Sequence, residues 1–215
     1  MATIDNLNKG HRQRLRERFL KGGEEAVADY ELLEMILFAA HPRGDVKPLA
    51  KKLLKQFGSF AKVLNADVTE YAAVDGVGEG AIASLKAVKA SSARMLKEKI
   101  KQGPIISNWT SLLNYCEAQM AHKKVEEFRI LFLNNKNELI ADEAQQQGTI
   151  NHTSVYPREV IKRALELGVS SIILCHNHPS GKLQPSNADK LITSKLKSAG
   201  ETLDIKVLDH LIITE

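Results

Sequence analysis

The chain has 215 residues, of which 43% are hydrophobic, and it carries a formal net charge of +4. This length and apolar fraction are enough for one large or two small packed domains that fold without covalent cross-links. Two cysteines do not make a disulfide framework, and the most hydrophobic run, residues 32–40, contains Glu34 and is too short to cross a bilayer, so we expect a cytoplasmic protein with no membrane contact.

The positive charge is concentrated in the first half of the chain. Residues 1–102 hold 18 Lys and Arg against 13 Asp and Glu, a net of +5, whereas residues 103–215 hold 12 against 13, a net of −1. Any contact with a polyanion such as DNA is therefore expected in the first half.

Residues 1–102 are predicted to be helical throughout. Apolar residues recur three and four positions apart in four segments, which are residues 12–20, 30–39, 46–56 and 81–99. The first segment contains the densest basic run, in which Arg12, Arg16 and partly Arg18 would share a helix face that could follow a phosphate backbone. A solvated helix face is the simpler interpretation of so short a run.

The segment from about residue 67 to 98 is predicted to contain a helix-hairpin-helix. Gly76 and Gly78 lie in its turn, where glycine accepts positive φ and has no Cβ, so backbone N–H groups at the start of the next helix could approach a DNA phosphate. Lys86 follows on that helix as a further phosphate contact. The alternative is a tight turn between two packed helices without a ligand, and the acidic Glu79 in the turn favours it.

A Gly-Pro break at residues 103–104 is the predicted domain boundary, and residues 103–215 are predicted to mix strands with helices. Helices are expected at residues 112–120 and 157–167 and from Ser186 onward. Strands are expected at residues 128–133, 138–145, 171–175 and 205–213, with residues 134–137 as a hairpin turn between the first two.

The most informative segment joins the strand at residues 171–175 to the helix that follows it. Side chains alternate along a strand, so His176 and His178 project from one face and Asn177 from the other. Asp189 falls in the first turn of the helix that Ser186 begins. Two histidines and one carboxylate are the protein ligands expected of a catalytic zinc, whose fourth position stays open to water.

Each part of this segment also has a plain structural interpretation. Ser186-x-x-Asp189 has the pattern of a capping box, and two histidines often stand at the exposed end of a strand without a metal. The joint pattern at one strand–helix junction favours the metal site. Cys175 adjoins His176 but points to the opposite strand face, which argues against a nucleophilic role.

These residues resemble the JAMM motif of the MPN/JAB metalloprotease superfamily, and their surroundings resemble the bacterial RadC family, also called UPF0758. The similarity covers nearly the whole chain and includes residues 10–19, 29–33, 57–59, 156–160 and 207–212. It implies an α/β fold class in which an all-helical region at residues 1–102 precedes a mixed α/β MPN domain, cytidine-deaminase-like, at residues 103–215. It also implies a zinc-dependent hydrolase and a historical link to DNA repair.

The resemblance further assigns roles to individual side chains. A glutamate on an early strand of the superfamily's domain moves the proton between water and leaving amine, and its position falls on Glu126, with Glu127 as the competitor. A shift of one residue turns a strand side chain to the other face, so only one of the two can point at the metal. Ser186 matches the position that stabilises the oxyanion. Asp209 and His210 in the last strand are similar to a family signature and could support the metal ligands, although such a pair in a strand is more often structural.

The leading hypothesis is therefore a zinc hydrolase that cleaves an amide bond, peptide or isopeptide, in a substrate that the sequence does not name, with DNA contact through the N-terminal region. The alternative is a DNA-binding, DNA-repair-associated accessory protein whose metal site is not catalytic. A metal-dependent nuclease is a third hypothesis, but a single His-His-Asp site differs from the paired carboxylates that hold two magnesium ions.

Overall fold

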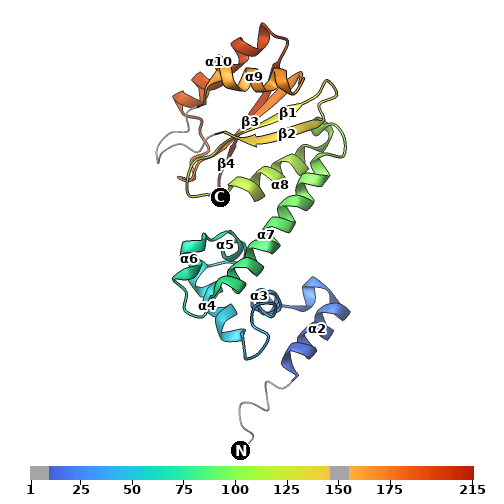
Figure 1. Cartoon of the computed structure of the whole chain (residues 1–215), viewed down its shortest axis with the longest axis vertical. Helices are drawn as coiled ribbons and strands as arrows, with labels where there is room; N and C mark the ends of the chain where they lie inside the picture. The colour runs from blue at the N-terminus through green and yellow to red at the C-terminus, as the bar shows by residue number, and fades with distance from the viewer. Residues whose placement is uncertain (1–9, 146–154) are drawn as a thin grey trace, which may run out of the picture. The chain divides into compact units, whose positions relative to one another are not determined.

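The computed structural model describes residues 10–145 and 155–215 (Figure 1). Its contacts divide the chain into two units between Ser91 and Ser92, which lies within helix α7 (Glu79–Ile100). The expected boundary at residues 103–104 is the place where the chain turns after α7, with Gly103 at a φ of +113°. The division by contacts thus falls earlier than the local break in the sequence.

The N-terminal unit is helical, as its apolar spacing predicts. Its buried side chains, Leu33, Leu37, Leu53 and Leu85 among them, form one cluster. The short helix Phe60–Asn65 was not predicted, because it is too short to show a period, and it begins at the polar cap Ser59. The short helix Val68–Ala72, which begins after Asp67, is the first helix of the predicted helix-hairpin-helix. The elements are α2 (His11–Gly22), the 3₁₀ turn η1 (Glu24–Ala26), α3 (Asp29–Leu37), α4 (Lys47–Phe57), α5 (Phe60–Asn65), α6 (Val68–Ala72) and the first part of α7.

The C-terminal unit is a four-stranded mixed sheet with helices on both faces, which confirms the predicted fold class. The strand order is β2-β1-β3-β4, with β1 antiparallel to both β2 and β3 and with β3 parallel to β4. A parallel pair needs a crossover, and a helix after β3 provides it. The elements are the 3₁₀ turn η2 (Ile105–Asn108), α8 (Trp109–Met120), β1 (Phe128–Leu133), β2 (Leu139–Ala144), α9 (Pro157–Glu166), β3 (Ser171–Asn177), α10 (Asn187–Glu201) and β4 (Lys206–Ile213).

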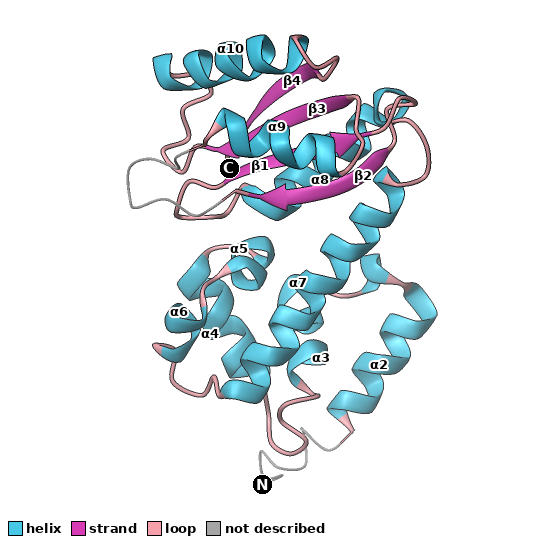
Figure 2. Cartoon of the chain, turned by 45° about the horizontal axis from the view of Figure 1, so that its top comes forward, coloured by secondary structure: helices cyan, strands magenta, loops and turns pink. Residues whose placement is uncertain are grey.

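Side-chain alternation along β3 sorts the core into two layers. Ile172 and Leu174 pack with α9 and α10 on one face, whereas Ile173 and Cys175 pack with α8 on the other (Figure 2). Every residue of β3 is buried, as expected of a central strand covered on both sides. Alternation therefore decides on which face of the sheet each residue after Leu174 places its side chain.

A bulge in β4 changes which of its side chains reach the α9/α10 face. Ile172 pairs with Val207, but Ile173 pairs with Asp209, so Leu208 is an extra residue on β4. Beyond the bulge His210 lies opposite Leu174 and joins the α9/α10 face. Without the extra residue, position 209 would stand there instead.

Both cysteines are free and buried, and Cys175 Sγ lies 3.4 Å from Met120 Sδ on the α8 side of the sheet. Cys175 therefore faces away from the histidine that follows it. The hydrogen bond with Cys116, together with burial, raises the pKa of the Cys175 thiol well above its ordinary value, which disfavours the nucleophilic thiolate. Across the part of the chain that the structure describes, we find no helix with the length and apolar character of a membrane span.

Candidate metal centre

The end of β3 places two imidazoles on the same face of the sheet. His176 follows Leu174 on the α9/α10 face and is completely buried. His178 lies just beyond the strand, where its backbone N–H donates to the Ile213 carbonyl at 2.9 Å and so extends the β3–β4 ladder. The alternation expected along the strand thus brings the two rings together, with centroids 4.6 Å apart.

The first turn of α10 brings a carboxylate to these rings. The His176 Nε2 and His178 Nε2 atoms are 2.8 Å apart, and Asp189 Oδ1 lies 3.3 Å from the former while Asp189 Oδ2 lies 3.5 Å from the latter. The three side chains can each offer one ligand atom within 4.8 Å of the others. The sequence alone brought these same three residues together as candidate ligands.

The capping box leaves Asp189 free to be a candidate metal ligand as well. The Ser186 backbone N–H donates to Asp189 Oδ2 at 2.7 Å, and the Asp189 backbone N–H donates to Ser186 Oγ at 3.1 Å. The cap fixes the rotamer of Asp189 and leaves Oδ1 facing His176. Burial raises the pKa of Asp189, but the hydrogen bonds from Ser186 and the nearby histidines outweigh it, so the pKa lies below its ordinary value and the carboxylate is ionised.

A chain of hydrogen bonds behind the site determines which nitrogen of each imidazole carries the proton. The Thr193 hydroxyl donates to the Asp189 carbonyl at 2.5 Å, so its oxygen accepts from His210 Nδ1–H at 2.6 Å. His210 Nε2 is then an acceptor, and His176 Nδ1–H donates to it at 2.8 Å. The neutral His176 ring therefore presents the lone pair of Nε2 to the site.

The His178 ring has the same tautomer for a separate reason. Its Nδ1 lies 2.6 Å from the Lys182 carbonyl oxygen, which can only accept, so Nδ1 carries the proton. With these tautomers, two Nε2 lone pairs face each other at 2.8 Å beside an ionised carboxylate, an arrangement that a bound cation would stabilise. Burial, with the charges of neighbouring histidines, lowers the pKa of His176 to about 4. Protonation of His176 is therefore disfavoured at neutral pH and does not supply the positive charge between the two rings. The donor set fits a divalent metal bound by two imidazoles and one carboxylate.

The metal-ligand cluster opens on one side into a cavity of about 430 Å³. Its lining includes His178, Ser186, Asp189, Lys182 and Glu126. Two residues that the resemblance links to catalysis, Glu126 and Ser186, therefore line the same cavity as two of the ligands. An ion held by the three ligands would be reached from this side.

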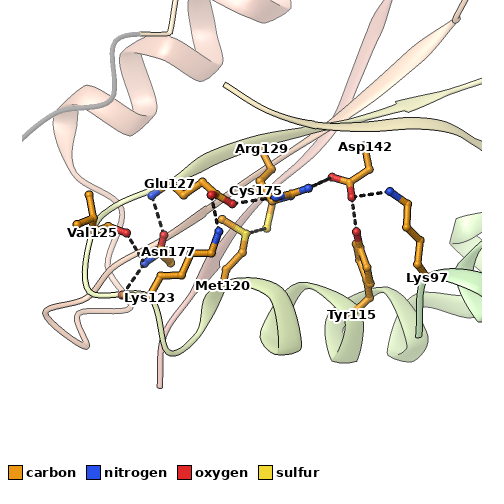
Figure 3. Close-up of polar contacts among 10 residues, drawn as sticks. All are labelled: Lys97, Tyr115, Met120, Lys123, Val125, Glu127, Arg129, Asp142, Cys175 and Asn177. Carbon is orange, nitrogen blue, oxygen red and sulfur yellow. Dashed lines mark hydrogen bonds and ion pairs between the residues drawn. The ribbon is translucent and has the colours of Figure 1, made fainter. Parts of the chain in front are cut away.

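Glu127 lies on the other side of β1, in a buried polar network (Figure 3). Its carboxylate pairs with Lys123 and, at 2.9 Å, with Arg129 Nη1. Burial raises the pKa of Glu127, but the hydrogen bonds and charges of Lys123 and Arg129 outweigh it and leave the pKa below its ordinary value. The network continues from Arg129 to Asp142, which Tyr115 and Lys97 also contact. Glu127 is thus held away from the metal-ligand cluster.

Asn177 fixes the loop that carries both glutamates, a role for which the sequence analysis made no prediction. Its Oδ1 accepts from the Glu127 backbone N–H at 2.8 Å, and its Nδ2 lies 3.1 Å from the Lys123 carbonyl and 3.3 Å from the Val125 carbonyl (Figure 3). One buried amide therefore ties residues 123–127 to the end of β3. Thr193 was also missed, although its position four residues after Asp189 places it on the same helix face.

In the N-terminal unit, the predicted hairpin forms between α6 and α7. Gly76 has a φ of +92°, and the carbonyl of Gly78 accepts the first backbone hydrogen bonds of α7. A Cβ at Gly78 would meet nothing within 4 Å, so the backbone there is open to an approaching group. The Lys86 ammonium donates to the Ala66 carbonyl and lies 5.4 Å from the Tyr71 ring centroid, so it is already engaged within the unit.

The basic run of α2 does not form a continuous solvated face. Arg12 and Arg16 lie over the Phe38 ring, at 4.5 and 5.6 Å from its centroid, and Arg18 pairs with Glu31. These side chains hold α2 against α3. The helix face expected to follow a phosphate backbone is thus partly used in packing.

The sequence matches known families over most of its length. Residues 106–215 match the family described as RadC-like JAB domain, and residues 7–83 match the family described as UPF0758 N-terminal. A UPF0758 protein from Ruegeria pomeroyi is 53% identical over 205 residues, which cover 95% of this chain and 92% of that protein. A UPF0758 protein from Rhodobacter capsulatus is 54% identical over 199 residues, 93% of each chain.

Proposed function

Since the chain belongs to the UPF0758 family and carries a RadC-like JAB domain of the MPN superfamily, we propose that it is a zinc-dependent hydrolase that cleaves an amide bond, peptide or isopeptide, in a protein or peptide substrate. The observation that carries this proposal is the pair of facing Nε2 lone pairs beside the Asp189 carboxylate. Hydrogen bonds on the far side of each ring hold both tautomers, so the ligands are set before a metal arrives.

Residues 10–145 and 155–215 offer three protein ligands rather than four, which favours a catalytic ion over a structural one. Bound there, zinc would lower the pKa of a coordinated water to about 7 and polarise a substrate carbonyl. The cavity on one side of the ligands gives a substrate carbonyl room to approach.

Glu126 is the proposed general base because it lines the cavity beside His178 and Asp189, whereas Glu127 is held by Lys123 and Arg129. Its carboxylate would take a proton from water and deliver it to the leaving amine. The loop that carries Glu126 is anchored by Asn177, so the base is held in place by a buried amide.

Ser186 is the proposed oxyanion donor. Its oxygen accepts the Asp189 backbone N–H, which leaves its own hydroxyl proton available to donate into the cavity that it lines. A single donor of this kind contributes about 3 kcal/mol where it has been removed from other hydrolases. The capping role and the catalytic role are therefore compatible in one side chain.

The test combines metal content with hydrolysis. Purified protein should carry about one zinc per chain, and His178→Ala should lose it. Glu126→Gln should keep the zinc but cleave a library of fluorogenic peptides and isopeptides at least about a hundredfold more slowly. The matched control is Glu159→Gln, which removes an exposed carboxylate that pairs with Arg158 on α9. This variant should keep both the zinc content and the rate of hydrolysis of wild type.

The same experiment separates the proposal from its alternative. Zinc bound at full occupancy without cleavage of any substrate would support a non-catalytic metal site in a DNA-associated accessory protein. Zinc retained in full by His178→Ala would refute the metal site itself.

We also propose that the hairpin between α6 and α7 contacts a DNA phosphate. The open backbone at Gly78, at the start of the 22-residue helix α7, supports this proposal. The engagement of Lys86 with Ala66 argues that the contact is made by backbone N–H groups rather than by this ammonium. Gly78→Val should weaken duplex binding and reduce its salt dependence, whereas Lys86→Gln should have a smaller effect on affinity. Equal affinities for Gly78→Val and wild type would refute the contact.

A further inference from the structure

The N-terminal unit contains a second cavity, of about 430 Å³, that the proposed hydrolase does not use. It is formed by the start of α2, the end of α3 and the loop that leads to α4. Its lining residues include the buried Glu34 and two arginines, Arg12 and Arg43. This volume lies within the range of about 300–1,000 Å³ that small-molecule sites occupy.

Glu34 provides an unused hydrogen-bond acceptor at this cavity. Its side chain is fully buried, and its Oε2 accepts from His11 Nε2 at 2.8 Å. Its Oε1 is one of two buried side-chain atoms without a hydrogen-bond partner in residues 10–145 and 155–215, the other being Nδ1 of His41. A buried acceptor without a donor is costly, and a carboxylate can only accept, so the missing partner is an N–H or O–H group.

The opposite charge is available at the same cavity. The Arg12 guanidinium carbon lies over the Phe38 ring, 4.5 Å from its centroid, and Arg12 Nη2 donates to the Gly44 carbonyl at 2.8 Å. Arg43 is exposed in the loop before α4. Asp45 also lines the cavity, but its Oδ1 accepts the backbone N–H of Lys47 at the start of α4. A ligand that fits this lining carries hydrogen-bond donors at one end and an anion at the other.

We propose that this cavity binds a guanine nucleotide, either free or as an unpaired residue of a single-stranded nucleic acid. Guanine has two adjacent donors, N1–H and N2–H₂, on its Watson–Crick edge. One complements the unpaired Oε1 of Glu34, and the other complements the second lone pair of Oε2, whose first accepts from His11. Adenine and cytosine place an acceptor beside their amino group, and that acceptor would face the Glu34 oxygens. Glu34 takes the base edge, Arg12 offers a guanidinium plane for stacking, and Arg43 pairs with the phosphate.

The proposal is independent of the metal centre, because all of these residues belong to the N-terminal unit. It is also distinct from the hairpin at Gly76 and Gly78, neither of which lines this cavity. A loss of nucleotide binding would therefore leave zinc content and hydrolysis unchanged.

The test is calorimetric titration of the full chain with GMP, AMP and guanosine, and with two single-stranded oligothymidines, one of which contains a single guanine. GMP should bind at least about tenfold more tightly than AMP and guanosine, because AMP lacks the donor pair and guanosine lacks the anion. Glu34→Gln should weaken GMP binding by about tenfold or more while leaving AMP binding unchanged, since an amide presents a donor as well as an acceptor. A role of Glu34 in packing alone would not change this preference.

Arg43→Ala keeps the test decisive if Glu34→Gln does not fold. This exposed side chain should be removable without a change in melting temperature, and its loss should weaken GMP binding by about tenfold. The matched control, Lys55→Ala, removes an exposed cation from α4 that does not line the cavity and should bind GMP like wild type. Preference for the guanine-containing oligonucleotide would extend the site to single strands, and binding of GMP alone would restrict it to free nucleotides. Equal binding of GMP and AMP, or unchanged GMP binding in Arg43→Ala, would overturn the proposal.

Discussion

His210 is predicted to control zinc affinity without contacting the ion. In the structure its Nε2 accepts a hydrogen bond from His176 Nδ1–H at 2.8 Å, and its Nδ1–H donates to the Thr193 hydroxyl at 2.6 Å. His210→Ala removes the only acceptor that the described residues offer to this buried N–H. An unpaired buried donor costs about 1–3 kcal/mol, and His176 can avoid this cost by moving the proton to Nε2, where it blocks coordination.

The expected result is a zinc affinity about 10- to 100-fold lower than that of wild type, which corresponds to about 1.4–2.7 kcal/mol. Competition with a chromophoric chelator at pH 7 measures it. His210→Gln should recover most of the loss, because a glutamine carbonyl can reach the place of the imidazole Nε2 and accept the same proton. Thr193→Val should show a smaller loss, since it leaves His210 in place.

The matched control is His122→Ala. His122 belongs to the same unit and makes a 3.9 Å contact with Glu215, but it takes no part in the chain of hydrogen bonds behind the metal ligands. It should bind zinc like wild type. If His210→Ala bound zinc within about threefold of wild type, the tautomer reasoning would be wrong, whatever the activity of the variant.

Three further predictions concern the scaffold. Asn177→Ala should lower the free energy of unfolding by about 2–4 kcal/mol, because three hydrogen bonds to residues 123–127 are lost, and should slow hydrolysis while zinc is retained; thermal unfolding and metal analysis would check this. Gly200→Ala should destabilise the protein by about 1–3 kcal/mol, since a Cβ there would overlap the Ile205 carbonyl oxygen, and a melting temperature equal to that of wild type would contradict it. The lowered pKa of Glu127 means that its stabilising contribution is present above its ordinary pKa of 4.5 and is lost as the pH falls through the folded-state pKa. Denaturant unfolding should therefore show a lower free energy of unfolding for Glu127→Gln than for wild type at pH 7. Below about pH 4.5 the stability of the variant should depend less on pH than that of wild type.

The sequence was sufficient for the metal ligands because they depend on local geometry. Alternation along β3 puts His176 and His178 on one face whatever lies around them, and a capping box places Asp189 in the first turn of α10. The strand Phe128–Leu133 was predicted to the residue, because its β-branched and aromatic residues are bounded by polar ones. These features repeat over a few residues and need no knowledge of distant partners.

The two interpretations of Ser186-x-x-Asp189 were not alternatives. The sequence offered a capping box or a metal ligand, and the structure is compatible with both, because Oδ2 of Asp189 accepts the Ser186 backbone N–H while Oδ1 lies 3.3 Å from His176 Nε2. The neighbouring glutamates were a different case. Their sequence positions are equivalent, and only the packing of Lys123 and Arg129 around Glu127 separates them, with Glu126 at the cavity.

The sequence by itself determined the helical first half, the mixed sheet of the second half and the three side chains that converge at the candidate metal site, since each follows from spacing within one or two neighbouring elements. Only the tertiary structure decided how those ligands are held. His210 reaches His176 because a bulge at Leu208 shifts the face of β4, and Glu34 is left with an unpaired oxygen because three separate segments close around it. Both results depend on contacts between residues far apart in the chain, which local propensity and periodicity do not encode.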